Sequence, residues 1–246
     1  MKPAAASRAE EISATLREEI LRGQYRAGER LPSERDLAAR FEANRGAVRE
    51  AIKKLEQMGI ADVTPGGVRV VPVEEATLDV LGHIIDLNES PDINLVNNLL
   101  EVLGALMSMS ARTAVETASE EQLADMRAIV AELIDNSGVP EGSLQNDQCW
   151  RKLSLLFTRI NKNLVLRLIL NGLKTQFIGR MRPAEPGISV DRERMIDIFR
   201  QLDQGLARRD PKLAAAAIAA HFEYLQATIR QLQAITTAVP GSNSNA

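Results

Sequence analysis

Two arginines at the start of a short helical pattern are the residues of this sequence best suited to specific recognition chemistry. Arg45 and Arg49 are four residues apart, so they share one side of a helix, and the small residues Gly46 and Ala47 follow the first of them. Apolar residues recur behind them at positions 48, 52 and 55. A guanidinium group can donate two hydrogen bonds to a guanine edge in the major groove of DNA. This pattern therefore predicts a DNA-recognition helix.

The elements around this helix form a recognisable series. Residues 31–59 predict two short helices with a break at about positions 42–44, in which Ser33 caps the first, answered by Asp36, and Asn44 caps the second. A helix over residues 7–23 precedes them. Short β-branched runs over residues 60–64 and 68–71 enclose Pro65, Gly66 and Gly67, which is typical of a hairpin. Three helices followed by a hairpin predict a winged helix-turn-helix.

The remainder of the chain has helical patterns and no strand pattern. We expect seven helices, at about residues 74–87, 93–116, 119–136, 144–160, 164–181, 190–208 and 210–237. In the second of these, a core stripe is expected at Leu95, Leu99, Val102, Leu106 and Met109. The predicted fold is mainly α: a winged helix-turn-helix domain over residues 1–72, an all-α antiparallel seven-helix bundle over 73–237, and a disordered tail over 238–246.

Composition narrows the class of protein. Residues 1–72 contain 13 Lys and Arg against 11 Asp and Glu, a net charge of +2, whereas the rest contains 17 against 22, a net charge of −5. No apolar run approaches the roughly 20 residues of a membrane span, and the single cysteine, Cys149, fits a reducing compartment. We expect a cytoplasmic protein with no membrane partner. Two histidines and one cysteine offer no nucleophile–base pair, so an enzyme is not expected.

The N-terminal motifs resemble those of the GntR family of bacterial transcription regulators. The resemblance covers about residues 8–71, where G-x-RLPSER-x-LA and VREA-x-x-x-L occur together ahead of a glycine-tipped wing. It implies a homodimer bound to a palindromic double-stranded DNA operator. The positions that match the family's DNA contacts are Arg35, Asn44, Arg45, Gly46, Ala47, Arg49, Gly66 and Gly67. Gly46 and Ala47 depart from the family pattern, which usually has hydroxyl residues there.

The helical part is similar to the FadR branch of that family, through NLVNNLLEVLGALMSMSART and LRLILNGLKTQFIGRM. This similarity implies an effector site inside the bundle, with a long-chain fatty acyl-CoA as the first candidate. Related proteins coordinate a metal through one Asp and three His, but here two of those positions fall on Arg151 and Arg194, so no metal and no cofactor is expected. The expected effector-binding residues are Arg112, Asp147, Arg151, Lys174, His221 and Tyr224.

Three alternatives remain open at this level. The effector could be another small organic acid or sugar acid. Leu103, which occupies a position where relatives that bind small carboxylates often have arginine, favours a more apolar cavity. An architectural DNA-binding protein would respond to no effector and would show little sequence preference. An enzyme with an appended DNA-binding module is the third.

Overall fold

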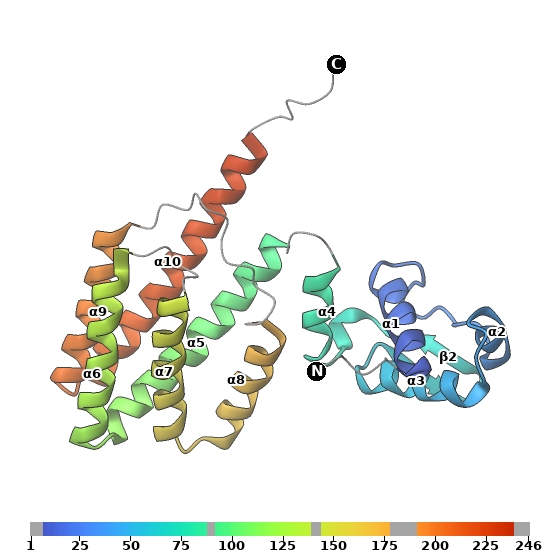
Figure 1. Cartoon of the computed structure of the whole chain (residues 1–246), viewed down its shortest axis with the longest axis horizontal. Helices are drawn as coiled ribbons and strands as arrows, with labels where there is room; N and C mark the ends of the chain where they lie inside the picture. The colour runs from blue at the N-terminus through green and yellow to red at the C-terminus, as the bar shows by residue number, and fades with distance from the viewer. Residues whose placement is uncertain (1–6, 88–91, 139–143, 178–190, 239–246) are drawn as a thin grey trace. The chain divides into compact units, whose positions relative to one another are not determined.

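The computed structural model describes residues 7–87, 92–138, 144–177 and 191–238. The chain divides into two compact units, Met1–Pro91 and Asp92–Ala246, each of which is described by itself. The expected tail lies almost wholly outside the described residues. Figure 1 shows the helices and the hairpin, coloured from blue at the N-terminus to red at the C-terminus.

The first unit has the predicted winged helix-turn-helix. Its elements are α1 (Arg8–Leu21), α2 (Glu34–Arg40), α3 (Arg45–Gln57), β1 (Ala61–Thr64), β2 (Gly67–Val70), the 3-10 turn η1 (Val73–Glu75) and α4 (Val80–Asp86). The two strands pair antiparallel, with Thr64 opposite Gly67, so that Pro65 and Gly66 form a two-residue turn at the wing tip. Both turn expectations, the hairpin and the break before α3, are confirmed.

Short polar side chains fix where these helices begin. The Ser7, Ser33 and Asn44 side chains each accept a hydrogen bond from a backbone N–H in the first turn of α1, α2 and α3. At α2 the Ser33 hydroxyl also donates to Asp36 Oδ2 at 2.6 Å. The Asp36 carboxylate therefore accepts a hydrogen bond from the Ser33 hydroxyl. In a full capping box it would accept one from the backbone N–H of the serine instead.

The boundary between the units lies later than the sequence predicted. Residues 73–87 were expected to begin the helical bundle, but they pack on the first unit. Val80 belongs to its apolar core, the Thr77 N–H donates to the Met58 carbonyl at 3.0 Å, and Arg22 Nη2 donates to the Leu87 carbonyl at 2.7 Å. Burial of Val80 in that core holds α4 there, so the first of the seven expected helices belongs to the first unit.

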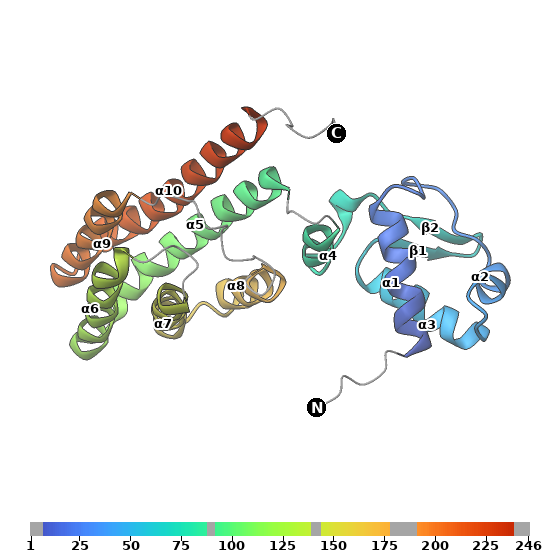
Figure 2. The same ribbon diagram turned by 45° about the horizontal axis from the view of Figure 1, so that its top comes forward.

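The described part of the second unit contains six α-helices and a 3-10 turn and, as predicted, no strand. They are α5 (Ile93–Thr117), α6 (Glu120–Asp135), η2 (Asn136–Gly138), α7 (Leu144–Ile160), α8 (Leu164–Phe177), α9 (Arg192–Ala207) and α10 (Pro211–Ala238). The long helices α5 and α10 run side by side in both ribbon views (Figure 1 and Figure 2). Gln226 of α10 donates to the Asn97 carbonyl of α5 at 2.9 Å.

Glycine permits the close approach of α5 and α10. A Cβ added to Gly104 of α5 would lie 2.8 Å from Cβ of Phe222, which is closer than two carbon atoms can pack. This contact turns Gly104 toward α10. Val102, two residues earlier, therefore falls on the outer side, and Val102 and Met109 are 48% and 45% exposed. The prediction that these two residues belong to the core was wrong, whereas Leu99 is buried as expected.

None of the described helices combines the length and the apolar character that a bilayer crossing requires.

Candidate functional site

The N-terminal end of α3 presents the two arginines singled out by the sequence. Asn44 Oδ1 accepts from the Ala47 N–H at 2.8 Å and so starts the helix at Arg45. Val48, Ile52 and Leu55 are buried on the opposite side of α3, which fixes its rotation. Arg45 is exposed and has no ion pair or hydrogen bond within the described residues. Its guanidinium is thus available to a ligand.

Arg49 is exposed but has a carboxylate partner that the sequence did not reveal. Its Nε lies 2.9 Å from Oε1 and 2.8 Å from Oε2 of Glu34, the first residue of α2. The Arg49 side chain remains 63% exposed. Both contacts use Nε, so the two terminal nitrogens make no hydrogen bond within the described part of the chain. They remain free for the two-pronged contact to a guanine.

Three further predicted contact residues lie near this end of α3. Arg35 is 80% exposed and lies 3.7 Å from the Asp36 carboxylate, a distance too long for a hydrogen bond. The hydrogen bond from the Ser33 hydroxyl is the main cause that lowers the pKa of Asp36; loss of hydration opposes it, and the charge of Arg35 adds a lesser lowering effect. Gly46 is exposed, and a Cβ there would approach the capping oxygen of Asn44 to 3.1 Å. Ala47 is half-buried and packs against the core, and its N–H is the donor to the Asn44 cap.

The wing tip is shaped by an arginine that sequence reasoning missed. Gly67 has φ +116°, and a Cβ there would lie 2.4 Å from Nε of Arg30. The Arg30 side chain therefore lies across Gly67 and is exposed beside the wing, close to Arg69, whose Nη1 donates to the Gly28 carbonyl at 2.9 Å. Gly66 is open, with Thr64 Oγ1 as its nearest neighbour at 3.8 Å.

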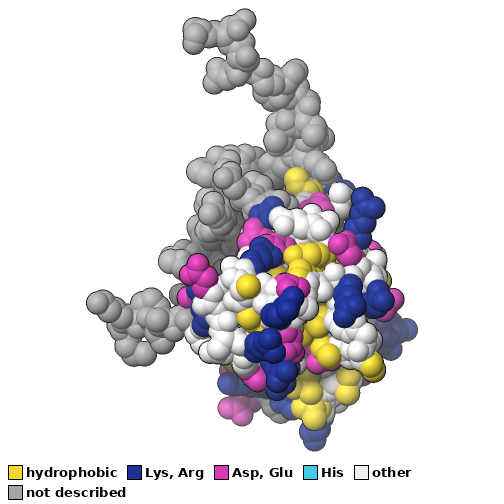
Figure 3. All heavy atoms as spheres, turned by 90° about the vertical axis from the view of Figure 1, so that its right-hand side faces the viewer, with side chains coloured by type: hydrophobic (Ala, Val, Ile, Leu, Met, Phe, Trp, Pro, Cys, Tyr) yellow, Lys and Arg dark blue, Asp and Glu magenta, His cyan; other side chains and the backbone are white. Residues whose placement is uncertain are grey.

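Figure 3 shows one face of the first unit, where groups of Lys and Arg side chains project with fewer Asp and Glu side chains between them. The structure thus places the predicted DNA-contact residues in one unit, at the start of α2, the start of α3 and the wing tip. It adds Arg30 and Glu34. The RLPSER motif contains both residues, but nothing local in it indicates that they contact Gly67 and Arg49.

In the second unit, His221 of α10 is the centre of an aromatic cluster. Its ring stacks on Trp150 of α7 with centroids 4.2 Å apart, and it lies 5.6 Å from the Phe199 ring and 5.5 Å from the Phe222 ring. His221 is only 4% exposed. Burial lowers the pKa of His221 to about 3, because the charged imidazolium would lose its hydration. The imidazole is therefore neutral at physiological pH.

Several buried polar atoms of this unit have no hydrogen-bond partner within the described residues: Asn97 Oδ1, Ser108 Oγ, Ser110 Oγ and His221 Nδ1. A buried polar atom without a partner costs free energy, so native proteins rarely retain one unless something satisfies it. Three of these atoms belong to α5 and one to α10, and a polar ligand that reached them would gain hydrogen bonds.

The structure brings together only part of the predicted effector site. His221 and Tyr224 are both buried on α10, and the Tyr224 hydroxyl accepts from the Asp191 N–H at 2.7 Å. Cζ of Arg194 lies 5.4 Å from the centre of the Tyr224 ring. Arg151 is exposed on α7, and the side chain of Asp147, which would pair with it, lies outside the described residues.

Arg112 and Lys174 do not join this cluster. Arg112 is exposed on α5, where its Nε lies 3.3 Å from Oε1 of Glu116, and Lys174 is exposed on α8. Both are surface cations in the described structure, and neither contacts His221 or Tyr224.

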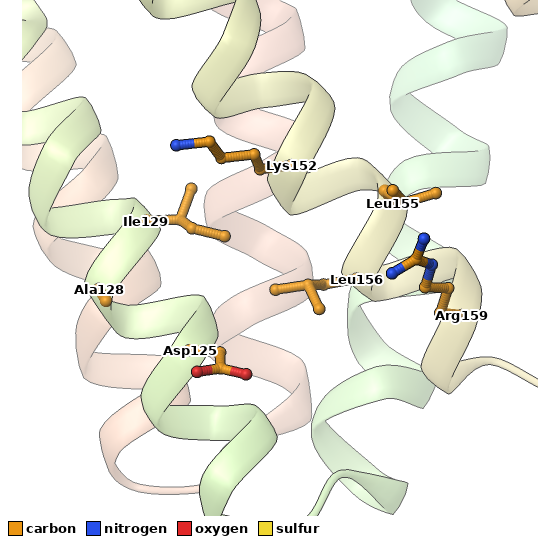
Figure 4. Close-up of a pocket in the computed structure, with 7 residues that line it drawn as sticks. All are labelled: Asp125, Ala128, Ile129, Lys152, Leu155, Leu156 and Arg159. Carbon is orange, nitrogen blue, oxygen red and sulfur yellow. The ribbon is translucent and has the colours of Figure 1, made fainter.

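An open groove of about 390 Å³ lies between α6 and α7 (Figure 4). It is lined by Asp125, Ala128, Ile129, Lys152, Leu155, Leu156 and Arg159, and by none of the six predicted effector residues. This groove is open to solvent and has no unpartnered buried polar atom. The buried polar atoms around His221 are therefore the better candidate for an effector site. No three His, Cys, Asp or Glu side chains among the described residues lie close enough together to hold a metal ion.

Two protein-family models match the chain. The model of bacterial regulatory proteins of the gntR family matches residues 8–71, and the FCD domain model matches residues 98–224, more than half of the 246 residues. The solved structure of Lar, which controls expression of the Listeria monocytogenes agr system, superposes with a TM-score of 0.56 at 20% identity, over 93% of this chain and 99% of that one. That similarity supports the fold.

Relatives of known sequence agree with these matches. The HTH-type transcriptional regulator Rv0494 of Mycobacterium tuberculosis is 28% identical over 86% of this chain and 85% of its own length. The Uxu operon transcriptional regulator of Escherichia coli is 34% identical over 48% of this chain and 45% of its own. The galactonate operon transcriptional repressor of the same organism is 27% identical over 53% and 58%. The chain belongs to the GntR family of DNA-binding transcription regulators, with an FCD domain as its second unit.

Proposed function

We propose that this protein is a cytoplasmic homodimeric regulator that binds a palindromic operator and is released from it, or modulated on it, by an acid bound in its FCD domain. The observation that supports DNA binding is the exposure of two arginines at the N-terminal end of α3. Within the described residues Arg45 is unpartnered and Arg49 has both terminal nitrogens uncommitted, on an exposed helix end whose far side is buried. These two arginines contact base edges in the major groove.

The surrounding residues supply contacts to the DNA backbone. Arg35 and the amide nitrogen of Asn44 approach phosphates, as does the backbone N–H group of Gly46, whereas the N–H of Ala47 is engaged by the Asn44 cap. The wing tip at Gly66 and Gly67 lies in the adjacent minor groove. Contacts of this kind set the register of a protein on the duplex, whereas base contacts supply the sequence preference.

Selection of bound sequences from a pool of random duplex DNA tests this proposal. We expect a short palindrome to be enriched, and Arg45→Ala to lose preference at one symmetric pair of positions. A wild-type chain that enriches no sequence would exclude the sequence-specific regulator and favour the architectural alternative.

For the effector we propose a small organic acid or sugar acid. Its hydroxyl groups would satisfy the interior atoms Ser110 Oγ and His221 Nδ1, which an alkyl chain cannot do. Since His221 is neutral, the carboxylate requires a cation, and Arg194, whose Cζ lies 5.4 Å from the centre of the Tyr224 ring, can supply it. The names of two partial relatives, regulators of the Uxu and galactonate operons, support the same class.

A long-chain fatty acyl-CoA is the second candidate. Leu103 supports it, because this apolar residue packs against the core of the FCD domain. Thermal unfolding in the presence of galactonate, glucuronate and palmitoyl-CoA separates the two classes, since a ligand that binds the folded state raises the melting temperature with concentration. Stabilisation by palmitoyl-CoA alone would contradict the sugar-acid proposal.

A further inference from the structure

Helix α8 presents an apolar face that nothing in the described part of its own unit covers. Leu164, Val165, Leu168 and Ile169 are 57%, 67%, 59% and 38% exposed. The inner side of the same helix packs in the interior of the unit, where Leu166, Leu170 and Leu173 are buried. Both ribbon views place α8 at the edge of the bundle formed by α5–α10 (Figure 1 and Figure 2). Exposed aliphatic side chains grouped in this way mark an interaction surface.

The spacing of this face suits another helix. Val165, Leu168, Ile169 and Gly172 follow the i, i+3, i+4, i+7 pattern of a helix-packing stripe. Gly172 lies within the helix, where glycine is unfavourable, and a Cβ there would meet nothing within 4 Å. No close packing within the described chain therefore accounts for this glycine. A helix approaching from outside would use the space that it leaves.

The positions of the two α8 cations are compatible with pairing to a second copy of the chain. Residues 148–177 contain six Lys and Arg and no Asp or Glu. The two cations within α8, Arg167 and Lys174, lie on the flank away from the stripe, since 3.6 residues make one turn. The stripe itself is uncharged. Two copies related by a twofold axis can therefore appose their stripes without bringing these like charges together.

The exposed area agrees with a role as the centre of an interface. Burying one aliphatic side chain removes roughly 60–120 Å² from water, so four partly exposed ones in each of two copies would contribute roughly 400 Å². A stable interface buries about 1,200 Å² or more in total. The stripe therefore provides an apolar core that a polar rim must surround.

We infer that the α8 stripe pairs with the α8 stripe of a second copy and forms the apolar centre of the homodimer. This inference rests on the dimer in the proposed function and assigns it to one face of the FCD domain. It also explains Gly172, because a residue without a side chain lets the two helices cross closely.

Matched charge insertions in the full-length chain test the inference. Leu168→Glu places a carboxylate in the stripe, and Arg167→Glu places one on the opposite flank of the same exposed helix. Because an unpaired charge is costly to bury, Leu168→Glu should weaken dimerisation roughly a hundredfold or more, whereas Arg167→Glu should leave it unchanged. Sedimentation equilibrium gives both dissociation constants, and circular dichroism verifies that the variants fold.

Cross-linking locates the contact directly. Under mild oxidation Gly172→Cys or Val165→Cys should form a disulfide-linked dimer, whereas Arg167→Cys and the wild type, whose Cys149 is buried, should not. A wild-type dimer that survives Leu168→Glu and is not cross-linked through the stripe would overturn the inference and leave the proposed dimeric regulator intact. A chain that is monomeric at micromolar concentration would contradict both.

Discussion

An ion pair between Glu34, the first residue of α2, and Arg49 of α3 joins these two helices. Both carboxylate oxygens of Glu34 lie within 2.9 Å of Arg49 Nε. An ion pair this exposed adds only about 0–1 kcal/mol to stability, so its main consequence is geometric. It holds the guanidinium in one orientation and engages neither terminal nitrogen, which would reduce the side-chain entropy lost in the proposed contact of Arg49 with a base.

Arg49→Ala should weaken binding of the homodimer to the selected operator by about 30-fold or more, because it removes one two-pronged arginine–guanine contact of about 1–3 kcal/mol from each of the two subunits. Fluorescence anisotropy with labelled operator measures the loss. Lys53→Ala is the control, since Lys53 is an equally exposed cation of the same helix that lies 3.1 Å from the Glu50 carboxylate. Equal losses for both variants would indicate a general electrostatic effect and would contradict the base contact.

Glu34→Ala should affect specific and non-specific DNA differently. Removing a carboxylate near the phosphates strengthens binding to any duplex, whereas releasing Arg49 from its orientation weakens the base contact. We therefore expect the ratio of operator affinity to random-duplex affinity to fall, with the random-duplex affinity itself rising. Titrations with both duplexes at one salt concentration give this ratio. A ratio equal to that of the wild type would show that the ion pair does not orient Arg49.

Gly67→Ala should destabilise the wing, whereas Gly66→Ala should not. At Gly67 the new Cβ would lie 2.4 Å from Arg30 Nε on a backbone with φ +116°, whereas at Gly66 the nearest atom is 3.8 Å away. A strained backbone position costs on the order of 1–3 kcal/mol. Hydrogen exchange of the β1 and β2 amides measures the local effect. Equal protection in the two variants would refute the proposed crowding by Arg30.

The sequence predicted the features that depend on neighbouring residues, but not the contacts between residues far apart in the chain. The caps at Ser33 and Asn44, the helices they start and the hairpin around Gly66 depend on residues within four positions of one another, so the sequence was sufficient. The Glu34–Arg49 pair spans fifteen residues, and the Arg30–Gly67 contact spans still more. Only the folded chain brings such residues together.

The second unit shows the same division. Its helices were predicted from periodicity, but the rotation of α5 depends on Gly104 meeting Phe222 of α10. This tertiary contact exposes Val102 and Met109, which a simple apolar stripe would bury. Likewise, α4 looks like any other amphipathic helix, and only the core position of Val80 assigns it to the first unit. The predicted anchors Arg112 and Lys174 were plausible by residue type alone, because sequence does not tell a cavity cation from a surface one.

The partly buried ion pair between Arg40 and Glu19 should contribute more to stability than the exposed ion pairs of the first unit. Arg40 Nη1 lies 3.0 Å from Glu19 Oε2 and joins α2 to α1, where the Glu19 side chain is only 12% exposed. The hydrogen bond to Glu19 raises the pKa of Arg40. Removing one partner leaves a poorly solvated charge.

We expect a double-mutant cycle of Glu19→Gln and Arg40→Gln to give a coupling free energy of about 1–3 kcal/mol. The same cycle at the exposed Glu50–Lys53 pair should give about 0.5 kcal/mol or less. Hydrogen exchange of slowly exchanging α1 amides measures both. Similar coupling at the two pairs would contradict the difference in burial.

His221 should make the FCD domain sensitive to acid. Its pKa is about 3 in the folded chain and about 6.5 when unfolded, so below pH 6.5 the unfolded chain binds a proton that the folded one does not. The free energy of unfolding therefore falls as the pH drops from 6.5 toward 3, by about 2 kcal/mol at pH 5. His221→Phe keeps an aromatic ring against Trp150 but cannot take up a proton, so its unfolding free energy should fall less over the same range. Urea unfolding followed by fluorescence of Trp150, the single tryptophan, measures both chains at pH 7.5 and pH 5. Equal losses in the two chains would show that His221 is protonated in the folded state or that other groups account for the pH dependence.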